Sequence, residues 1–345
     1  MLETIASALD ELWQQEKPFV FFRLPNADKI HLYYQEDKVL HLTKDLTEAG
    51  FVFAPFEKKE YLAYIPAKHK ADYLIPSFQA SSRVQNLEEP EADQLHFIDL
   101  VERAQKVIKN EKLSKLVVSR PVTIPFGGSF ASVFLRLIDL YPNALVYLWN
   151  HPKVGVWLGA SPEMLLTQKG TTFHTMALAA TQPKNETGQY KWSAKEIKEQ
   201  ALVTTQIKED LSLYFSVSQL KVSKPYTKEA GNLVHLCTDL MGEQASMSLR
   251  KVVDVLHPTP AVGGIPKDKA IQFIQQEEGY ARTYYTGFLG PFSSHSTQLF
   301  VNLRCASYQE KALTLFVGAG ITSESNPQKE WEETQHKAQT LQAAL

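Results

Sequence analysis

Cysteine is scarce in this sequence. Its two cysteines among 345 residues, Cys237 and Cys305, both lie inside apolar runs. Buried thiols of this kind are typical of proteins in reducing compartments, so neither a disulfide framework nor a cysteine-based metal site is predicted. The spacing of cysteines and histidines also fits no zinc-binding motif.

An excess of positive charge is missing as well. Lysine and arginine total 36 and aspartate and glutamate total 38, which gives a formal net charge of −2. This balance lacks the basic footprint of a nucleic-acid-binding protein. No apolar run approaches the length of a membrane span, and acidic residues near the start argue against a signal peptide. We therefore expect a cytoplasmic protein with neither a nucleic-acid nor a membrane partner.

The sequence does contain enough apolar material for a large core. Hydrophobic residues make up 44% of the chain and aromatic residues 11%. Apolar residues recur at helical spacing in residues 96–108, and strand-like segments follow at 115–119, 144–149, 154–158 and 172–178. This mixture of helices, strands and hairpins predicts the α+β class.

A polar segment that carries a proline, residues 88–93, follows an N-terminal part with several short strand-like runs. We take this segment as a link. It divides the chain into a strand-rich N-terminal part, residues 1–92, and a larger region, residues 93–345. We expect the two parts to form one compact domain.

The last thirty or so residues hold the most informative pattern. An apolar strand, residues 313–317, ends at the glycines of a GAG sequence, and Asn326-Pro327 supplies the N-cap and first position of a helix. Glu330, Glu333 and Lys337 share one face of that helix. Two carboxylates one turn apart can hold a hard divalent cation. Taken alone, such a pair is more often a solvated helix face.

Further motifs occur in a fixed order along the chain. They are Lys115 in KLVVSR, Glu163 in GASPEML, the ALAAT stretch at 177–181, Glu199 in SAKEIKEQ, the HPTPAVGGIP turn at 257–266 followed by Glu278, Arg282, Tyr285 and Gly287, and the GAG sequence at 318–320. Together they resemble the chorismate-binding enzymes, which include isochorismate, salicylate, anthranilate and aminodeoxychorismate synthases. The resemblance implies the family's fold, a two-layered β-sheet core surrounded by helices.

The resemblance also implies a reaction. In this family a nucleophile attacks C2 of chorismate while the C4 hydroxyl leaves, which requires a base for the nucleophile and an acid for the leaving oxygen. By resemblance, Lys115 is the base and Glu163 is the acid. On the residues alone, Lys115 would be interpreted as a surface lysine at the end of a strand, and Glu163 could simply face water.

A magnesium ion is the expected cofactor. By resemblance, Glu199 and Glu333 are the closest ligands, and Glu330 and Glu196 hold metal-bound waters. Mg²⁺ usually keeps several waters and takes few protein carboxylates, which leaves room for a substrate carboxylate. Without the resemblance, Glu196 and Glu199 would be read as solvated residues of a helix that begins at a capping box.

The remaining site residues are expected to bind the substrate chorismate. The resemblance assigns its enolpyruvyl carboxylate to Tyr285, Arg304, the backbone at Gly318 and Gly320, and the charge of Lys337. It places further contacts at Leu178, Ala180, Thr181, His235 and Ala261. An internally hydrogen-bonded core histidine is an equally reasonable interpretation of His235.

The sequence departs from the family pattern at two motifs. The usual L-A-G-T appears here as Leu178-Ala179-Ala180-Thr181, so a methyl group stands where the backbone is expected to approach substrate. Gln200 replaces the histidine that usually follows the metal glutamate.

Among family members, the sequence favours water as the nucleophile. Members that form amines characteristically lack a lysine at the position of Lys115, so we predict an isochorismate synthase without a glutaminase partner, acting in menaquinone or catechol siderophore biosynthesis. Salicylate synthase, which adds pyruvate elimination, is the alternative, and Ala261 argues against it because the salicylate-forming relatives tend to carry threonine there. An anthranilate synthase component I and a non-catalytic chorismate-binding protein are less favoured.

Overall fold

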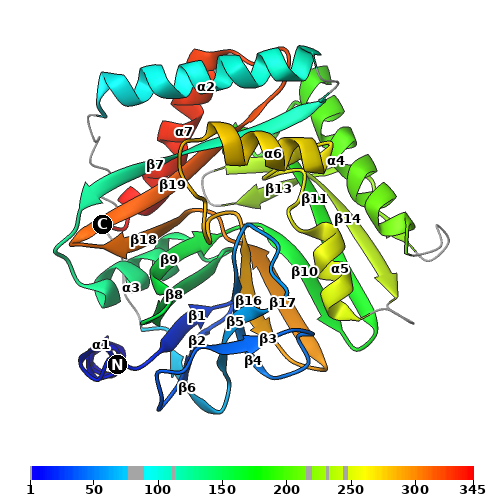
Figure 1. The fold of residues 1–345 in the computed structure, drawn as a ribbon. Helices are drawn as coiled ribbons and strands as arrows, with labels where there is room; N and C mark the ends of the chain where they lie inside the picture. The colour runs from blue at the N-terminus through cyan, green and yellow to red at the C-terminus, as the bar shows by residue number, and fades with distance from the viewer. Residues whose placement is uncertain (1, 77–88, 111–112, 215–219, 231–232, 244–247) are drawn as a thin grey trace.

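Two large antiparallel β-sheets packed face to face form the centre of the molecule, with helices on their outer faces (Figure 1). The structure, a computed structural model, describes residues 2–76, 89–110, 113–214, 220–230, 233–243 and 248–345. The predicted α+β class and the two-layered sheet core are confirmed.

The first sheet is built from strands β1 (Phe19–Arg23), β2 (Lys29–Tyr34), β6 (His69–Leu74), β7 (Lys115–Pro125), β8 (Leu145–His151), β9 (Gly155–Ser161), β15 (Gly264–Ile265), β18 (Cys305–Gln309) and β19 (Ala312–Ile321). Their spatial order is β15-β7-β19-β18-β9-β8-β1-β2-β6. The pairing of β7 with β19 joins two segments that lie far apart in the sequence.

The second sheet contains β3 (His41–Thr43), β4 (Gly50–Ala54), β5 (Leu62–Pro66), β10 (Met164–Lys169), β11 (Thr172–Pro183), β12 (Lys221–Val222), β13 (Tyr226–Ala230), β14 (Leu233–Glu243), β16 (Phe288–Phe292) and β17 (Ser296–Val301). The order is β12-β14-β11-β10-β17-β16-β4-β5-β3, and β13 also pairs with β14.

Period-two alternation explains how the sheets stack. On β1, Phe19 and Phe21 pack into the core on the outer face of the first sheet. Val20 and Phe22 point the other way, into an aromatic core shared with β4, β16 and β17 of the second sheet. Because successive side chains of a strand point to opposite faces, a strand that is apolar throughout is buried on both sides.

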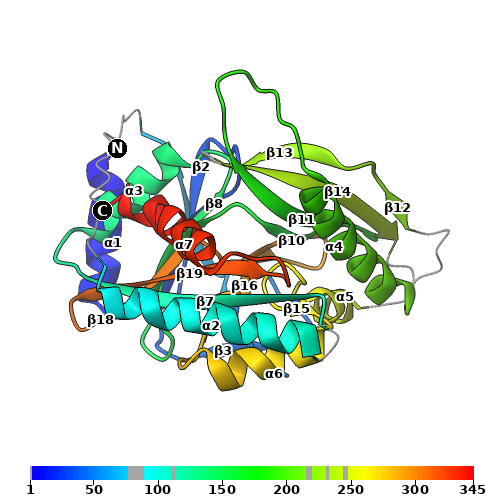
Figure 2. The ribbon, with the colours of Figure 1, turned by 90° about the horizontal axis from the view of Figure 1, so that it is seen from above.

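The helices cover the outer faces of both sheets. They are α1 (Leu2–Gln14), α2 (Glu91–Asn110), α3 (Phe130–Leu140), α4 (Ala194–Ser212), α5 (Leu249–Leu256), α6 (Lys267–Glu277) and α7 (Pro327–Gln342). Figure 2 shows α2 and α7 beside β7 and β19, and α4 beside β11 and β14. Within the described ranges, no helix is long and apolar enough to cross a membrane.

The N-terminal part contributes strands to both sheets. β1, β2 and β6 belong to the first sheet, whereas β3, β4 and β5 belong to the second. The expected boundary at residue 92 falls inside α2, which begins at Glu91, and residues 77–88 lie outside the described ranges. Residues 1–92 and 93–345 therefore share their cores across this boundary.

One strand ends earlier than its apolar run. The run from Leu299 to Leu303 predicts a strand over these residues, but β17 ends at Val301 and Arg304 adopts a positive φ of 49°. The chain crosses here from the second sheet to the first, where β18 begins at Cys305. Asn302 fixes the crossing, since its side chain accepts from the Tyr147 hydroxyl at 2.7 Å and donates to the carbonyl of Tyr284 at 2.9 Å.

Candidate active site

A cavity lies between the sheets, where β7 and β19 of the first face β11 and β14 of the second. The predicted site residues that line it are Lys115, Glu163, Leu178, Ala180, Thr181, Glu199, His235, Ala261, Tyr285, Arg304, Gly318, Gly320, Glu333 and Lys337. Glu196 and Glu330 are outside this lining. The motifs of the sequence therefore converge on one place.

Lys115 lies at the start of β7 and is almost fully enclosed. Its Nζ is 2.8 Å from the Oε1 of Glu199, which projects from α4 on the other side of the cavity. Gly320 lies against the lysine side chain, and a Cβ added at Gly320 would be only 3.2 Å from Lys115 Cε. The absence of a side chain at Gly320 therefore leaves room for the end of the lysine chain.

Gly318 provides similar clearance one step along β19. A Cβ at this position would meet the Tyr285 hydroxyl at 3.1 Å and the carbonyl oxygen of Val118 at 2.8 Å. The carbonyl of Gly318 accepts a hydrogen bond of 2.7 Å from Lys337 Nζ, which is also 2.5 Å from Glu333 Oε1. The GAG sequence thus makes room for polar side chains and ties α7 to β19.

Glu163 immediately precedes β10 and is 6% exposed. Its own carbonyl accepts from the backbone N–H of Val301 at 2.9 Å, which fixes its place on the sheet. Burial raises the pKa of Glu163 to about 7, although nearby lysines, including Lys115 and Lys228, act in the opposite direction. Glu163 therefore retains a proton close to neutral pH, as a general acid must.

Arg304 reaches the cavity from the crossing between β17 and β18. Its Nη1 donates to the carbonyl of Lys337 at 3.1 Å and to Oγ1 of Thr340 at 3.4 Å. Both acceptors are neutral, and Glu333 is the carboxylate whose negative charge acts on the guanidinium. Neither of these two hydrogen bonds is made to a carboxylate, so the position suits the substrate carboxylate that the resemblance assigns to Arg304.

His235 and the ALAAT stretch meet at the other wall. The Nδ1 of His235 lies 3.0 Å from Oγ1 of Thr181 and 3.1 Å from the carbonyl oxygen of Ala180. Burial lowers the pKa of His235 to about 4, so the ring is neutral at physiological pH. His235 therefore lines the cavity, as a substrate contact would, and is also hydrogen-bonded within the protein, as a core histidine would be.

Ala180 is the extra residue of a β-bulge. The register with β14 shifts between Ala179 and Thr181, and Ala180 has a φ of 58°. This left-handed conformation is favourable for glycine and strained for alanine. The departure from the family's glycine therefore carries a conformational cost.

Replacing this alanine should stabilise the protein. We expect Ala180→Gly to raise the free energy of unfolding by up to about 1 kcal/mol, because the strain of a left-handed alanine exceeds the entropic cost of a glycine. Urea denaturation measures the change. Ala179→Gly is the matched control: Ala179 is buried on the same strand without a positive φ, so its replacement should destabilise. Equal destabilisation by both substitutions would contradict this explanation.

The carboxylates of the cavity suit a magnesium ion in part. Glu199 and Glu333 line the cavity from α4 and α7, and Mg²⁺ is commonly bound by one or two carboxylates, water and a substrate anion. Burial opposes ionisation of Glu333, yet Lys337 and Arg304 hold its pKa below the usual value, which favours the ligand form. Among the described residues, no three His, Cys, Asp or Glu side chains are grouped closely enough to hold a metal.

The other two glutamates have different surroundings. Glu196 closes the capping box of α4, where its Oε2 accepts from the backbone N–H of Ser193 at 2.7 Å, and its Oε1 accepts from Gln182 at 2.8 Å. Glu330 is buried in the first turn of α7. Gln200, which replaces the family histidine, is buried and donates to the hydroxyls of Thr204 and Thr238 at 2.8 and 2.7 Å. It therefore anchors α4 to β14 beside Glu199.

Phe316 is a wall residue that the motifs did not identify. Its ring stacks on Tyr285 with centroids 5.3 Å apart and planes at 17°, and it lines the cavity. Alternation along β19 provides a signal that could have found it, because Phe316, Gly318 and Gly320 share one face. Lys228 also went unnoticed: it lies on β13 outside every motif, with its Nζ 3.3 Å from the sulfur of Met176.

Comparison with known proteins agrees with this geometry. A family profile described as chorismate binding enzyme matches residues 51–345. The isochorismate synthase EntC of Escherichia coli (strain K12) is 34% identical over 262 residues, which cover 72% of this chain and 66% of that protein. The vibriobactin-specific isochorismate synthase of Vibrio cholerae is 31% identical over 245 residues, or 67% of this chain and 62% of that protein.

The match thus spans less than two thirds of the length of these relatives. Among solved structures, MenF, the menaquinone-specific isochorismate synthase from Escherichia coli, superposes with a TM-score of 0.80, covering 95% of this chain and 88% of that chain. At 21% identity, this likeness establishes a shared fold.

Proposed function

The chain belongs to the chorismate-binding enzymes, and we propose that it is an isochorismate synthase. The reaction adds water at C2 of chorismate and releases the C4 hydroxyl. One observation carries the proposal: Lys115 and Glu163 line the same cavity as Arg304 and Lys337. A base, an acid and two cations are the groups that this conversion of a dicarboxylate requires.

Glu163 is the proposed general acid. The C4 hydroxyl leaves as water only if it receives a proton, and the raised pKa of Glu163, about 7, keeps that proton available near neutral pH. Enclosure between the sheets limits competition from bulk water. Below a pH of about 7, most Glu163 side chains are therefore in the protonated form that the step requires.

Lys115 is the proposed base for the attacking water. An amine accepts a proton only in its neutral form. The Nζ of Lys115 lies 2.8 Å from the Oε1 of Glu199, so the base and a proposed metal ligand are neighbours. Glu199 and Glu333 would hold Mg²⁺, which when bound supplies positive charge to these carboxylates and to a carboxylate of the substrate.

Arg304 and Lys337 are the proposed partners of the enolpyruvyl carboxylate, together with Tyr285 and the backbone at Gly318 and Gly320. A guanidinium and an ammonium group on one wall fix the orientation of an anion by charge-assisted hydrogen bonds. Phe316, stacked on Tyr285, offers an apolar surface beside them. This arrangement would place the substrate ring between Lys115 and Glu163.

Two related functions differ in the product. A salicylate synthase would continue from isochorismate to eliminate pyruvate, and Ala261 on the cavity wall offers no hydroxyl to assist that step. An anthranilate synthase component I would need ammonia, and Lys115 favours water instead. We infer a cytoplasmic enzyme of menaquinone or catechol siderophore biosynthesis that works without a glutaminase.

Product identity tests this proposal. Incubation of the purified protein with chorismate and Mg²⁺, followed by chromatography, is expected to yield isochorismate with little salicylate. Ala261→Thr, which supplies the missing hydroxyl, is expected to raise the salicylate share. If the wild-type protein releases salicylate and pyruvate as fast as chorismate disappears, the alternative is correct. If chorismate is bound but not consumed, the protein is a binding protein.

A further inference from the structure

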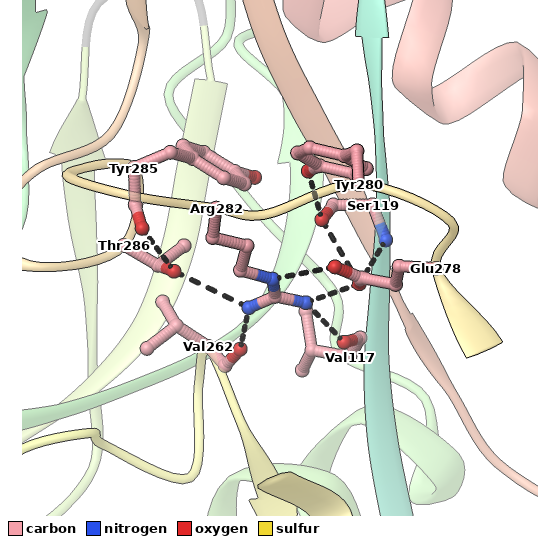
Figure 3. A network of polar contacts seen from close by, with 8 residues as sticks. All are labelled: Val117, Ser119, Val262, Glu278, Tyr280, Arg282, Tyr285 and Thr286. Carbon is pink, nitrogen blue, oxygen red and sulfur yellow. Dashed lines mark hydrogen bonds and ion pairs between the residues drawn. The ribbon is translucent and has the colours of Figure 1, made fainter. Parts of the chain in front are cut away.

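Figure 3 shows a buried ion pair, Glu278 and Arg282, together with its hydrogen-bond partners, several of which line the cavity. Glu278 caps the C-terminus of α6, and Arg282 follows four residues later. Their side chains are 0% and 1% exposed. The contact is bidentate: Nε of Arg282 donates to Oε2 of Glu278 at 2.8 Å, and Nη2 donates to Oε1. Neither residue lines the cavity, so neither has a part in the proposed chemistry.

The pair completes the hydrogen bonding along one edge of β7. On its other edge β7 pairs with β19, and on this edge the short strand β15 pairs with Leu116 and Lys115. Further along, Nη2 of Arg282 donates to the carbonyl of Val117 at 2.8 Å, and the N–H of Ser119 donates to Glu278 at 2.8 Å. The side chains of Glu278 and Arg282 therefore make the hydrogen bonds to β7 that a neighbouring strand would make just after Lys115.

The same guanidinium holds two more segments of the wall. Its Nη1 donates to the carbonyl of Val262 at 2.8 Å and to the hydroxyl of Thr286 at 3.3 Å. Val262 follows Ala261 in the turn, and Thr286 follows Tyr285. Val117, Val262 and Thr286 all line the cavity. The Arg282 side chain thus connects three separate segments that form the surface of the cavity.

We propose that the Glu278–Arg282 pair is a positioning unit, which fixes Lys115, Ala261 and Tyr285 relative to one another. This inference rests on the proposed function. A buried ion pair is often no more stabilising than apolar side chains of the same volume, so stability alone gives little reason for it. The planar fork of arginine, with its donors at fixed angles, defines geometry in a way that a lysine cannot.

Arg282→Lys tests the positioning role, because it keeps the charge and removes the fork. A displacement of about 1 Å at reacting groups can cost about 10²-fold in rate. We therefore expect kcat to fall by about 10²-fold and KM to change much less, since Arg304 and Lys337, the proposed cationic partners of the substrate, lie on other elements. A kcat per folded molecule equal to the wild type would overturn the proposal.

Arg250→Lys is the matched control. Arg250 likewise pairs with an acid four positions away, Asp254 at 2.8 Å, and donates to the backbone carbonyls of Lys44, Lys59 and Glu60. It does not line the cavity. We expect this variant to unfold at a lower temperature with an unchanged kcat. An equal loss of kcat in both variants would mean that the effect is general destabilisation, and the proposal would fail.

Hydrogen exchange of residues 115–119 provides a readout without substrate. Exchange there should be faster in Arg282→Lys and unchanged in Arg250→Lys, and wild-type exchange in both would overturn the proposal. The exchange measurement can be made even if the wild type does not act on chorismate. A lack of activity on chorismate would refute the proposed function, whereas unchanged exchange would refute the positioning role.

If Arg282→Lys does not fold, Ser119→Ala replaces it. This change leaves both charges and removes the hydroxyl contacts to Glu278 at 3.0 Å and Tyr280 at 2.7 Å. We expect kcat to fall roughly tenfold, and an unchanged kcat in the folded variant would count against the positioning role.

Discussion

Glu163→Gln is expected to lower kcat by at least about 10²-fold, because it removes the proton that the C4 hydroxyl must receive. Glutamine has nearly the same shape, so the fold should survive. Steady-state kinetics on the variant, with circular dichroism to verify folding, measures the effect. Glu229→Gln is a suitable control, since Glu229 is exposed and paired with Lys184 at 2.6 Å; its kcat should not change.

Lys115→Ala should produce a loss of the same order, because the base for water is then absent. A folded Lys115 or Glu163 variant with near-wild-type turnover would refute the assignment of acid and base. If only one of the two variants loses turnover, only that residue transfers a proton in the reaction.

The protonation of Glu163 also predicts a pH dependence. The acid works while protonated, so kcat/KM should decline about tenfold per pH unit above its pKa of about 7. Since Lys228 lowers this pKa, Lys228→Met should move the decline to higher pH. Linkage gives the same sign for stability: the folded pKa lies above the usual 4.5, so the contribution of Glu163 is lost as pH rises through about 7. A decline unaffected by Lys228→Met would implicate another group.

Removal of Mg²⁺ is the second change with a large expected effect. Treatment with a chelator should abolish turnover, and added Mg²⁺ should restore it. Glu199→Ala and Glu333→Ala should each lower turnover by at least about 10²-fold and weaken Mg²⁺ binding measured by calorimetry, because each removes one of the two cavity carboxylates proposed to hold the ion.

Glu332→Ala is the control for the metal site. Glu332 adjoins Glu333 on α7 but is exposed, so its loss should leave both metal binding and turnover intact. Full turnover after thorough chelation would show that the reaction proceeds without a metal. Unchanged calorimetric binding in both Glu199→Ala and Glu333→Ala would place the ion elsewhere.

The resemblance to the chorismate-binding enzymes predicted many of the residues that line this cavity, and local patterns explain the directions in which some of them point. Alternation along β7 and β19 places Lys115 and the two glycines toward the same space, and the capped starts of α4 and α7 set the faces that carry Glu199 and Glu333. Both signals act over a few residues, where backbone geometry dictates side-chain direction.

Contacts between distant segments could not be predicted in the same way. Lys115 and Glu199 are separated by 84 positions, and their ion pair depends on how α4 packs across the cavity. The apolar run before Arg304 is continuous in sequence, but Asn302 turns it from one sheet to the other. The role of Arg282 is similarly invisible, because its acceptors lie on three segments that only the fold brings together.

The most direct test of the account is the mass of the first product formed in ¹⁸O-labelled water. If Lys115 activates water for attack at C2 while Glu163 protonates the departing C4 hydroxyl, isochorismate isolated at early times will carry one ¹⁸O atom at C2. Isochorismate without the label would mean that the hydroxyl migrates within the substrate, and the assignment of base and acid in this cavity would be wrong.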